Sequence, residues 1–211
     1  MNATLLSVGL IALWAVVLVL LLLAMRILRQ LRAEDELRAK QDELEHSPAL
    51  PVGALAPDFR ARTLSGEPAR LADYAKRAVA FIFVSPRCGQ CRNELRKLDR
   101  LAPLAKQRAG VEFILVSDRG AAETNAWITT VREEDALEVP LQVLVAPLTA
   151  SDFLSSYNPQ LVLPFFCLVD EGGVVQARDP LGMGTWPELQ QSWEGGGPAA
   201  KPFAWLANRD R

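Results

Sequence analysis

The chain has 211 residues, of which 23 are basic and 25 are acidic, and its formal net charge is −2. That balance argues against a nucleic-acid-binding protein and against one that binds an anionic membrane surface through a basic excess. With three cysteines and one histidine, the chain has few ligands for a mixed Cys/His zinc site. The roughly 160 residues from Pro51 onward are enough to bury a core without disulfide staples.

The first predicted element is a membrane anchor. Residues 3–25 are apolar except for Thr4 and Ser7 and carry no charge. A helix of this length, rising about 1.5 Å per residue, would span the roughly 30 Å hydrocarbon core of a bilayer. No Lys or Arg precedes the run and no small-x-small site ends it, which favours an uncleaved anchor over a signal peptide. We therefore expect residues 1–25 to form a transmembrane anchor.

The charged stretch that follows is expected to be a juxtamembrane helix and linker, residues 26–50. Its leucines fit a heptad only loosely, which favours a solvated helix over a coiled-coil dimer. Ser47-Pro48 and Pro51 then break the helix. They mark the start of one folded domain, residues 51–211.

Within that domain, apolar runs that favour strands alternate with amphipathic helical segments. Strands are predicted near residues 59–61 and at 79–84, 111–117, 141–145, 165–169 and 174–177, and helices at 94–107, 123–131, 150–157 and 186–193. Asp170-Glu171-Gly172-Gly173 is the expected turn of a terminal hairpin. This order of elements predicts an α/β sandwich with a mixed central sheet.

The most informative motif is Cys88-Gly89-Gln90-Cys91, which follows the 79–84 strand and opens a helix. Unpaired N–H groups and the partial positive charge of a helix N-terminus stabilise a thiolate. Cys88 is therefore predicted to be the nucleophile, and Cys91, one turn on, to resolve a mixed disulfide. Arg87 would favour the thiolate further if its side chain lies near the sulfur. A strand–CxxC–helix context favours thiol–disulfide exchange over half a zinc site or a structural disulfide.

Three segments carry a resemblance to a known family: residues 51–59, residues 63–66 (Thr-Leu-Ser-Gly) and residues 83–91, which end in the dithiol. They resemble the membrane-anchored thioredoxin-like disulfide oxidoreductases of the TlpA/ResA type. Within that group the chain is most similar to the MauD-type methylamine-utilisation proteins, which share the anchor, a Ser-Pro-x-Cys-x-x-Cys site and a Leu-Pro, here Leu163-Pro164. The resemblance implies a thioredoxin-like α/β sandwich with a mixed central sheet, preceded by one transmembrane helix.

The resemblance also implies further site residues. The proline before the penultimate strand is cis in such folds and faces the dithiol, which maps onto Pro164, and the Leu163 backbone would pair with an extended substrate. On the sequence alone, Pro164 could equally be a proline at a strand start. A glutamate three positions after the second cysteine tunes the thiols in this family, and Glu94 stands there. The alternative is a first-turn glutamate that serves the helix dipole.

The chain differs from the thioredoxin and peroxiredoxin motifs at several positions, and these differences narrow the expected chemistry. Arg87 and Gln90 stand where thioredoxin has Trp and Pro, so its specificity and potential are not transferable. The peroxiredoxin pattern needs a proline at position 81, and this residue is Phe81, which disfavours peroxide reduction. Cys167 lies in an apolar run and is expected to pack in the core.

The function that the resemblance implies is thiol–disulfide exchange on extracytoplasmic proteins, in the maturation of a disulfide-rich enzyme such as methylamine dehydrogenase. We expect protein thiol or disulfide substrates and a membrane or soluble redox partner, with no cofactor, metal or nucleic acid. The alternative from another class is a copper-binding metallochaperone or assembly scaffold that uses the two thiols as ligands.

Two signals conflict on which side of the membrane the folded domain lies. Arg26, Arg29 and Arg32 come directly after the apolar span, and the positive-inside rule alone would place the domain in the cytoplasm. Tethered members of the family work outside the cytoplasm, where disulfides persist. We expect a single-pass protein of the cell membrane with its domain on the periplasmic side.

Overall fold

The computed structural model describes residues 50–137 and 141–195, together with Leu13, Trp14, Val17, Leu18, Leu21, Met25 and Arg26. The chain divides into two compact units, residues 1–47 and 48–211. The described residues of the first unit are helical. Across all described residues, no helix combines the length and apolar character needed to cross a membrane. Most of the predicted anchor and of the linker 26–50 lies outside the described residues, as do residues 196–211.

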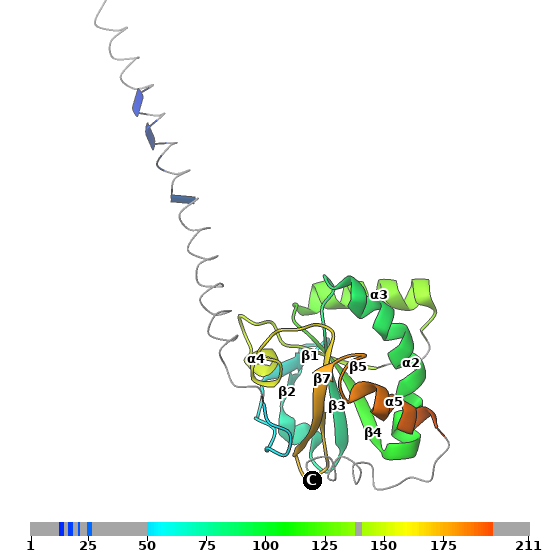
Figure 1. Cartoon of the computed structure of the whole chain (residues 1–211). Coiled ribbons are helices and arrows are strands. Elements are labelled where there is room, and N and C mark those ends of the chain that lie inside the picture. The colour runs from blue at the N-terminus through cyan, green and yellow to red at the C-terminus, as the bar shows by residue number, and fades with distance from the viewer. Residues whose placement is uncertain are drawn as a thin grey trace, which may run out of the picture. The chain divides into compact units, whose positions relative to one another are not determined.

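A seven-stranded mixed sheet organises the second unit, in the order β2-β1-β5-β4-β3-β6-β7 (Figure 1). The strands are β1 Ala61–Thr63, β2 Pro68–Ala69, β3 Ala78–Val84, β4 Val111–Ser117, β5 Gln142–Val145, β6 Phe165–Val169 and β7 Val175–Pro180. β3, β4 and β5 run parallel to one another, and the remaining pairs are antiparallel. Because parallel strands end at the same edge of a sheet, the loops after these three strands meet there.

Helices cover both faces of the sheet. They are η1 Leu71–Tyr74, α2 Gly89–Ala109, α3 Ala121–Asp135, α4 Phe153–Tyr157 and α5 Trp186–Glu194. One core cluster joins α2, α3 and α5 to one set of alternate β3 residues, including Ala80 and Ile82. The other joins α4, η1 and the segment before β1 to the opposite set, including Phe81 and Phe83. Every residue of β3 is therefore buried, as its continuous apolar run predicts.

Both outer edges of the sheet are short or partly covered. β2 has two residues, and one of them, Pro68, has no N–H to donate. At the other edge, the N–H groups of Gly53 and Ala56 each donate a 2.8 Å hydrogen bond to the β6–β7 hairpin. The N–H of Val175 donates in return to the Ala54 carbonyl at 2.9 Å. The segment before β1 thus lies along the start of β7.

The predicted α/β sandwich with a mixed central sheet is confirmed, and the predicted boundaries are most accurate for the long apolar runs. The strands at 111–117 and 165–169 are as predicted, and β3 begins one residue earlier than predicted. α2 begins at Gly89, five residues before the predicted start, because the CxxC itself forms the first turn. β1 starts two residues after the predicted start at residue 59, and β7 ends three residues after the predicted end at residue 177.

Candidate active site at the Cys88–Cys91 dithiol

The dithiol forms the first turn of α2. Cys88 is the N-cap residue, with extended backbone angles of φ −97° and ψ 106°. Its sulfur accepts a hydrogen bond from the backbone N–H of Cys91 at 3.1 Å. The sulfur therefore lies at the positive end of a 21-residue helix. This position favours a thiolate once the disulfide is reduced.

Cys88 and Cys91 are joined by a disulfide, with their Cα atoms 5.3 Å apart. The two cysteines differ in access, since Cys88 is partly exposed and Cys91 is completely buried. An incoming sulfur can react only with an atom that it can reach. Cys88 is therefore the accessible sulfur of the pair, and Cys91 is the internal one.

The Leu163 carbonyl lies beside the dithiol, although 75 residues separate Leu163 from Cys88 in the sequence. The peptide bond between Leu163 and Pro164 is cis, as the resemblance implies. The carbonyl oxygen of Leu163 is 3.8 Å from the Cys88 sulfur. The Pro164 carbonyl accepts a 3.0 Å hydrogen bond from the N–H of Leu181, which joins the start of β6 to the loop after β7.

The loop before Pro164 is held by Asn158, a buried residue that the sequence analysis missed. Its side-chain amide donates to the Val162 carbonyl at 2.7 Å, and its oxygen accepts from the Val162 N–H at 3.3 Å. Between them, Leu161 has a left-handed φ of 52°, which is unfavourable for a non-glycine residue. The available sequence signal was the turn dipeptide Asn158-Pro159.

Glu94 lies on the buried face of α2, where only 7% of the residue is exposed. Lys97 Nζ is 2.8 Å from its Oε1 atom. Because α2 begins at Gly89, Glu94 lies in the second turn, and the first turn contains no acidic residue. The interpretation of Glu94 as a first-turn glutamate is therefore wrong. Its predicted effect on the thiols stays a prediction, and its position three residues after Cys91 places both on one side of the helix.

Arg87 reaches from the loop before α2 to the first turn of α3. Its Nε atom is 3.1 Å from Glu123 Oε1, and both side chains are exposed. The carboxylate offsets part of the positive charge next to Cys88, so the predicted effect of Arg87 on the thiolate is reduced. Glu123 lies 36 residues along the chain from Arg87, and nothing in the local sequence indicates this pairing.

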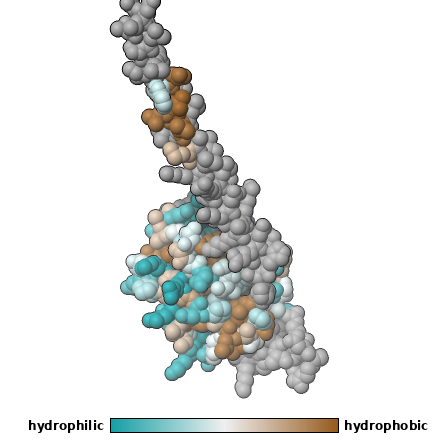
Figure 2. All heavy atoms as spheres, turned by 90° about the vertical axis from the view of Figure 1, so that its left-hand side faces the viewer, coloured by the Kyte–Doolittle hydropathy of each residue, from teal (hydrophilic) through white to brown (hydrophobic). Residues whose placement is uncertain are grey.

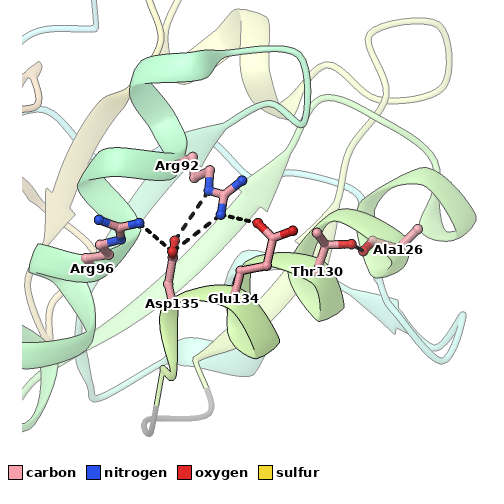
Figure 3. A network of polar contacts seen from close by, with 6 residues as sticks. All are labelled: Arg92, Arg96, Ala126, Thr130, Glu134 and Asp135. Carbon is pink, nitrogen blue, oxygen red and sulfur yellow. Dashed lines mark hydrogen bonds and ion pairs between the residues drawn. The ribbon is translucent and has the colours of Figure 1, made fainter.

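A second ion-pair network joins α2 to the other end of α3 (Figure 3). Arg92, which directly follows Cys91, contacts both Glu134 and Asp135, and Arg96 contacts Asp135. The Asp135 side chain is only 3% exposed. Hydrogen bonds from Arg96 and Arg92 lower the pKa of Asp135 to about 2. The network fixes the end of α3 to the first two turns of α2.

The third cysteine lies outside the site. Cys167, in β6, is free and completely buried. Burial raises the pKa of its thiol to about 12, so it stays protonated near neutral pH. This agrees with the predicted core position. In the part of the chain that the structure describes, no group of three or more His, Cys, Asp or Glu side chains could hold a metal ion.

Comparison with known proteins places the chain in a family. Residues 52–178, more than half of the chain, match the AhpC/TSA family. The matched span includes the dithiol, Leu163-Pro164 and all strands except the end of β7. No curated protein sequence matches the chain.

Solved structures share the fold at low sequence identity. The thioredoxin domain of a thiol-disulfide oxidoreductase from Bacteroides vulgatus has a TM-score of 0.53 and 24% identity, covering 68% of this chain and 98% of that one. A thiol:disulfide interchange protein from Bacteroides sp. has a TM-score of 0.54 and 23% identity, over 70% and 93% of the two chains. A yeast mitochondrial 1-Cys peroxiredoxin has a TM-score of 0.54 and 17% identity, over 69% and 75%. The chain belongs to the AhpC/TSA family, and its fold is thioredoxin-like.

Proposed function

We propose that this chain exchanges disulfides with protein substrates outside the cytoplasm, and that Cys88 forms the mixed disulfide. The observation that carries the proposal is the asymmetry of the dithiol. The Cys88 sulfur is accessible and lies at a helix N-terminus beside the Leu163 carbonyl, while Cys91 is buried. Two neighbours in fold are named a thiol-disulfide oxidoreductase and a thiol:disulfide interchange protein, the activity proposed here.

In the oxidising direction, a client thiolate attacks the Cys88 sulfur. The bond between Cys88 and Cys91 breaks as the client–Cys88 bond forms, and Cys91 leaves as a thiolate that takes up a proton. A second client thiolate then attacks the client sulfur of the mixed disulfide. Cys88 leaves as a thiolate, the client departs with a disulfide, and two electrons have passed to the dithiol. The same steps in reverse reduce a client disulfide.

The two sulfurs need different kinds of stabilisation during these reaction steps. The Cys88 thiolate is stabilised by the N-terminus of α2, where the Cys91 N–H lies 3.1 Å from the sulfur. Cys91 has no access to water, and a buried thiolate is unfavourable. We assign to Glu94 the exchange of a proton with Cys91, because both lie on the buried side of α2 three residues apart.

Substrate binding is assigned to Leu163 and Pro164. The backbone of Leu163 would pair with an extended client segment, and Pro164, which lacks an N–H, ends that pairing. The Leu163 carbonyl is within 4 Å of the reacting sulfur, at 3.8 Å. A client held on this backbone therefore presents its cysteine close to Cys88.

The location and the client are proposals of the same kind. Residues 1–25 would tether the domain, and an extracytoplasmic position suits a protein that works on disulfides. The client class is a protein that matures with several disulfides, with the small subunit of methylamine dehydrogenase as the candidate from the MauD resemblance. A reporter fused to the carboxyl end, active only when exported, tests the topology. Activity of a cytoplasm-specific reporter would overturn it.

Trapping the mixed disulfide tests the proposed chemistry. Cys91→Ala removes the resolving thiol, so a client stays attached to Cys88 until a reductant releases it. We expect a covalent adduct from this variant and none from the Cys88→Ala/Cys91→Ala control. Mass spectrometry of the released client identifies it. Absence of any adduct would overturn the proposal, and stoichiometric Cu(I) binding by the wild type would then support the copper alternative.

A further inference from the structure

A groove opens at the same edge of the sheet as the dithiol. It has a volume of about 730 Å³ and lies between the β1–β2 hairpin, the start of α3 at Gly120 and Ala121, and the segment after β5 at Pro147. The loops after β4 and β5 lie at the sheet edge that carries Cys88, because β3, β4 and β5 are parallel. A molecule that binds at Cys88 can therefore extend across the strand ends into the groove.

Three arginines line this groove: Arg60, Arg62 and Arg70. All three are exposed. Within the described ranges none of them forms an ion pair with a carboxylate. Arg62 donates a 2.9 Å hydrogen bond to the carbonyl of Gly66, which leaves its charge uncompensated. Figure 2 looks onto the left-hand side of Figure 1 and shows hydrophilic residues beside a hydrophobic patch on that face of the domain.

The two acidic residues of the groove are already engaged by backbone groups. Asp58 Oδ1 accepts a hydrogen bond from the N–H of Leu71 at 3.2 Å. Asp73 Oδ2 accepts one from the N–H of Arg70 at 2.9 Å. Both carboxylates thus secure the turn around η1, and neither forms an ion pair with a groove arginine in the described chain. The arginines outnumber them, so the groove is basic.

The N-terminus of α3 adds to the positive potential. Gly120 is its N-cap, and no side chain caps the 15-residue helix. Its first N–H groups carry partial positive charge, and Ala121 lines the groove. The acidic residue of the first turn, Glu123, is paired with Arg87. The helix end and the three arginines therefore act together on whatever occupies the groove.

We propose that this groove binds an acidic segment of the client protein while the client cysteine reacts at Cys88. This rests on the proposed function and names the substrate class of the same site. Carboxylates match the planar fork of an arginine, which gives orientation as well as attraction. Adjacent strands lie about 4.8 Å apart, so the three spacings from β3 to β1 cover about 14 Å. An extended peptide spans that distance in about four or five residues.

The test uses two synthetic peptides and the reduced full-length protein. In both peptides, one cysteine forms a mixed disulfide with 2-mercaptoethanol. About four residues from this cysteine, on each side, one peptide carries a block of glutamates and the other a block of glutamines. We expect the glutamate peptide to be reduced about tenfold faster at low salt, since a few exposed ion pairs give an effect of this order. High salt should remove most of that difference.

The variant Arg60→Gln/Arg62→Gln should lower the preference for the glutamate peptide at least threefold. The matched control Lys76→Gln/Arg100→Gln removes the same charge from exposed residues outside the groove and should keep the preference. Neutral 2-hydroxyethyl disulfide should react at the same rate with every variant. Exchange without any charge preference, or an equal loss in both variants, would overturn the groove proposal alone. A wild type that reduces none of these disulfides would overturn the proposed function and this inference with it.

Discussion

Two neighbouring strand–helix units, β3–α2 and β4–α3, use the same turn and differ in what they place at the helix N-terminus. Ser85 follows β3 and Ser117 ends β4, and each hydroxyl accepts the backbone N–H of the arginine two residues later, at 3.2 Å. The chain then enters α2 through Cys88, whose sulfur caps the helix, and enters α3 through Gly120, which has no side chain to do so.

The comparison separates the contribution of the fold from that of the side chain. The fold supplies two helix N-termini at one edge of the sheet, each with the partial positive charge that stabilises an anion. At the N-terminus of α2, the Cys88 sulfur makes redox chemistry possible. The N-terminus of α3 has only backbone N–H groups beside three arginines, an arrangement that suits binding without reaction. The following predictions change one unit at a time.

Cys88→Ser should have the largest effect. Serine is a good N-cap residue, so α2 keeps its cap, whereas an alcohol is not ionised near neutral pH and cannot form a disulfide. Exchange with a peptide disulfide should fall by at least about a thousandfold. The control Cys167→Ala should keep a rate near that of the wild type, because that thiol is buried. Substantial exchange by Cys88→Ser would contradict a reaction at this sulfur.

Thr124→Val tests a side-chain contact that is present in β4–α3 and has no counterpart in β3–α2. The hydroxyls of Ser117 and Thr124 are 2.7 Å apart and completely buried. Replacing Thr124 leaves a buried hydroxyl short of a partner, so the free energy of unfolding should fall by about 2 kcal/mol. Urea denaturation measures this. Ser117→Ala/Thr124→Val should destabilise by less than the sum of the single changes, and strict additivity would show that the contact contributes nothing.

Asp135→Asn removes the carboxylate that joins the two helices. The folded-state pKa of about 2 is below the value of about 3.9 for an unfolded chain. The ion pairs therefore stabilise the protein above pH 4, and this stabilisation is lost as the pH falls through 2. At pH 7 the variant should be less stable than the wild type, and the difference should shrink with falling pH and disappear below pH 2. The exposed neighbour Glu133, replaced by Gln, should show no such pH dependence.

Glu123→Gln removes the carboxylate that offsets Arg87. The unpaired guanidinium should favour the Cys88 thiolate and so stabilise the reduced dithiol, which makes the protein a stronger oxidant. Because the pair is exposed, the equilibrium constant with glutathione should shift only about threefold, and less at high salt. Glu133→Gln makes the same charge change on α3 and serves as the control. An equal shift in both variants would indicate a general charge effect.

Gly120→Ser should have the smallest effect, because it gives the second helix the cap that it lacks. The backbone is extended, with φ −68° and ψ 162°, and no atom lies within 4 Å of the added Cβ. We expect the free energy of unfolding to rise by a few tenths of a kcal/mol. The preference for the glutamate peptide should fall, since the hydroxyl occupies an N–H of the groove. Destabilisation would indicate that Gly120 is required for another reason.

Local patterns were sufficient for the features that depend on neighbouring residues. The apolar runs of β3, β4 and β6 and the CxxC between a strand and a helix could be read directly from the sequence. The start of α2 could not, because Gly89 and Gln90 carry no strong helix signal and the cap is a sulfur. The cis peptide bond between Leu163 and Pro164 was predicted only from the family resemblance.

Features that depend on distant contacts were not predictable from one sequence. Asp135 pairs with Arg92 across 43 positions, and Glu123 with Arg87 across 36. Both pairings arise because α2 and α3 pack on the same face of the sheet. The groove likewise depends on strand order, since β1 lies beside β5 although 78 residues separate their ends, Thr63 and Gln142, in the chain.

The outer edges of the sheet bear on how the protein meets chains that are not yet folded. β2 offers only two residues, one of them a proline, and residues 53–56 already occupy the start of β7. An extended client therefore finds little free strand edge on which to add, and it must meet the protein across the strand ends. Client proteins that lack their disulfides expose apolar segments that can aggregate. The short β2 and the partly covered β7 leave such segments little strand edge on which to add.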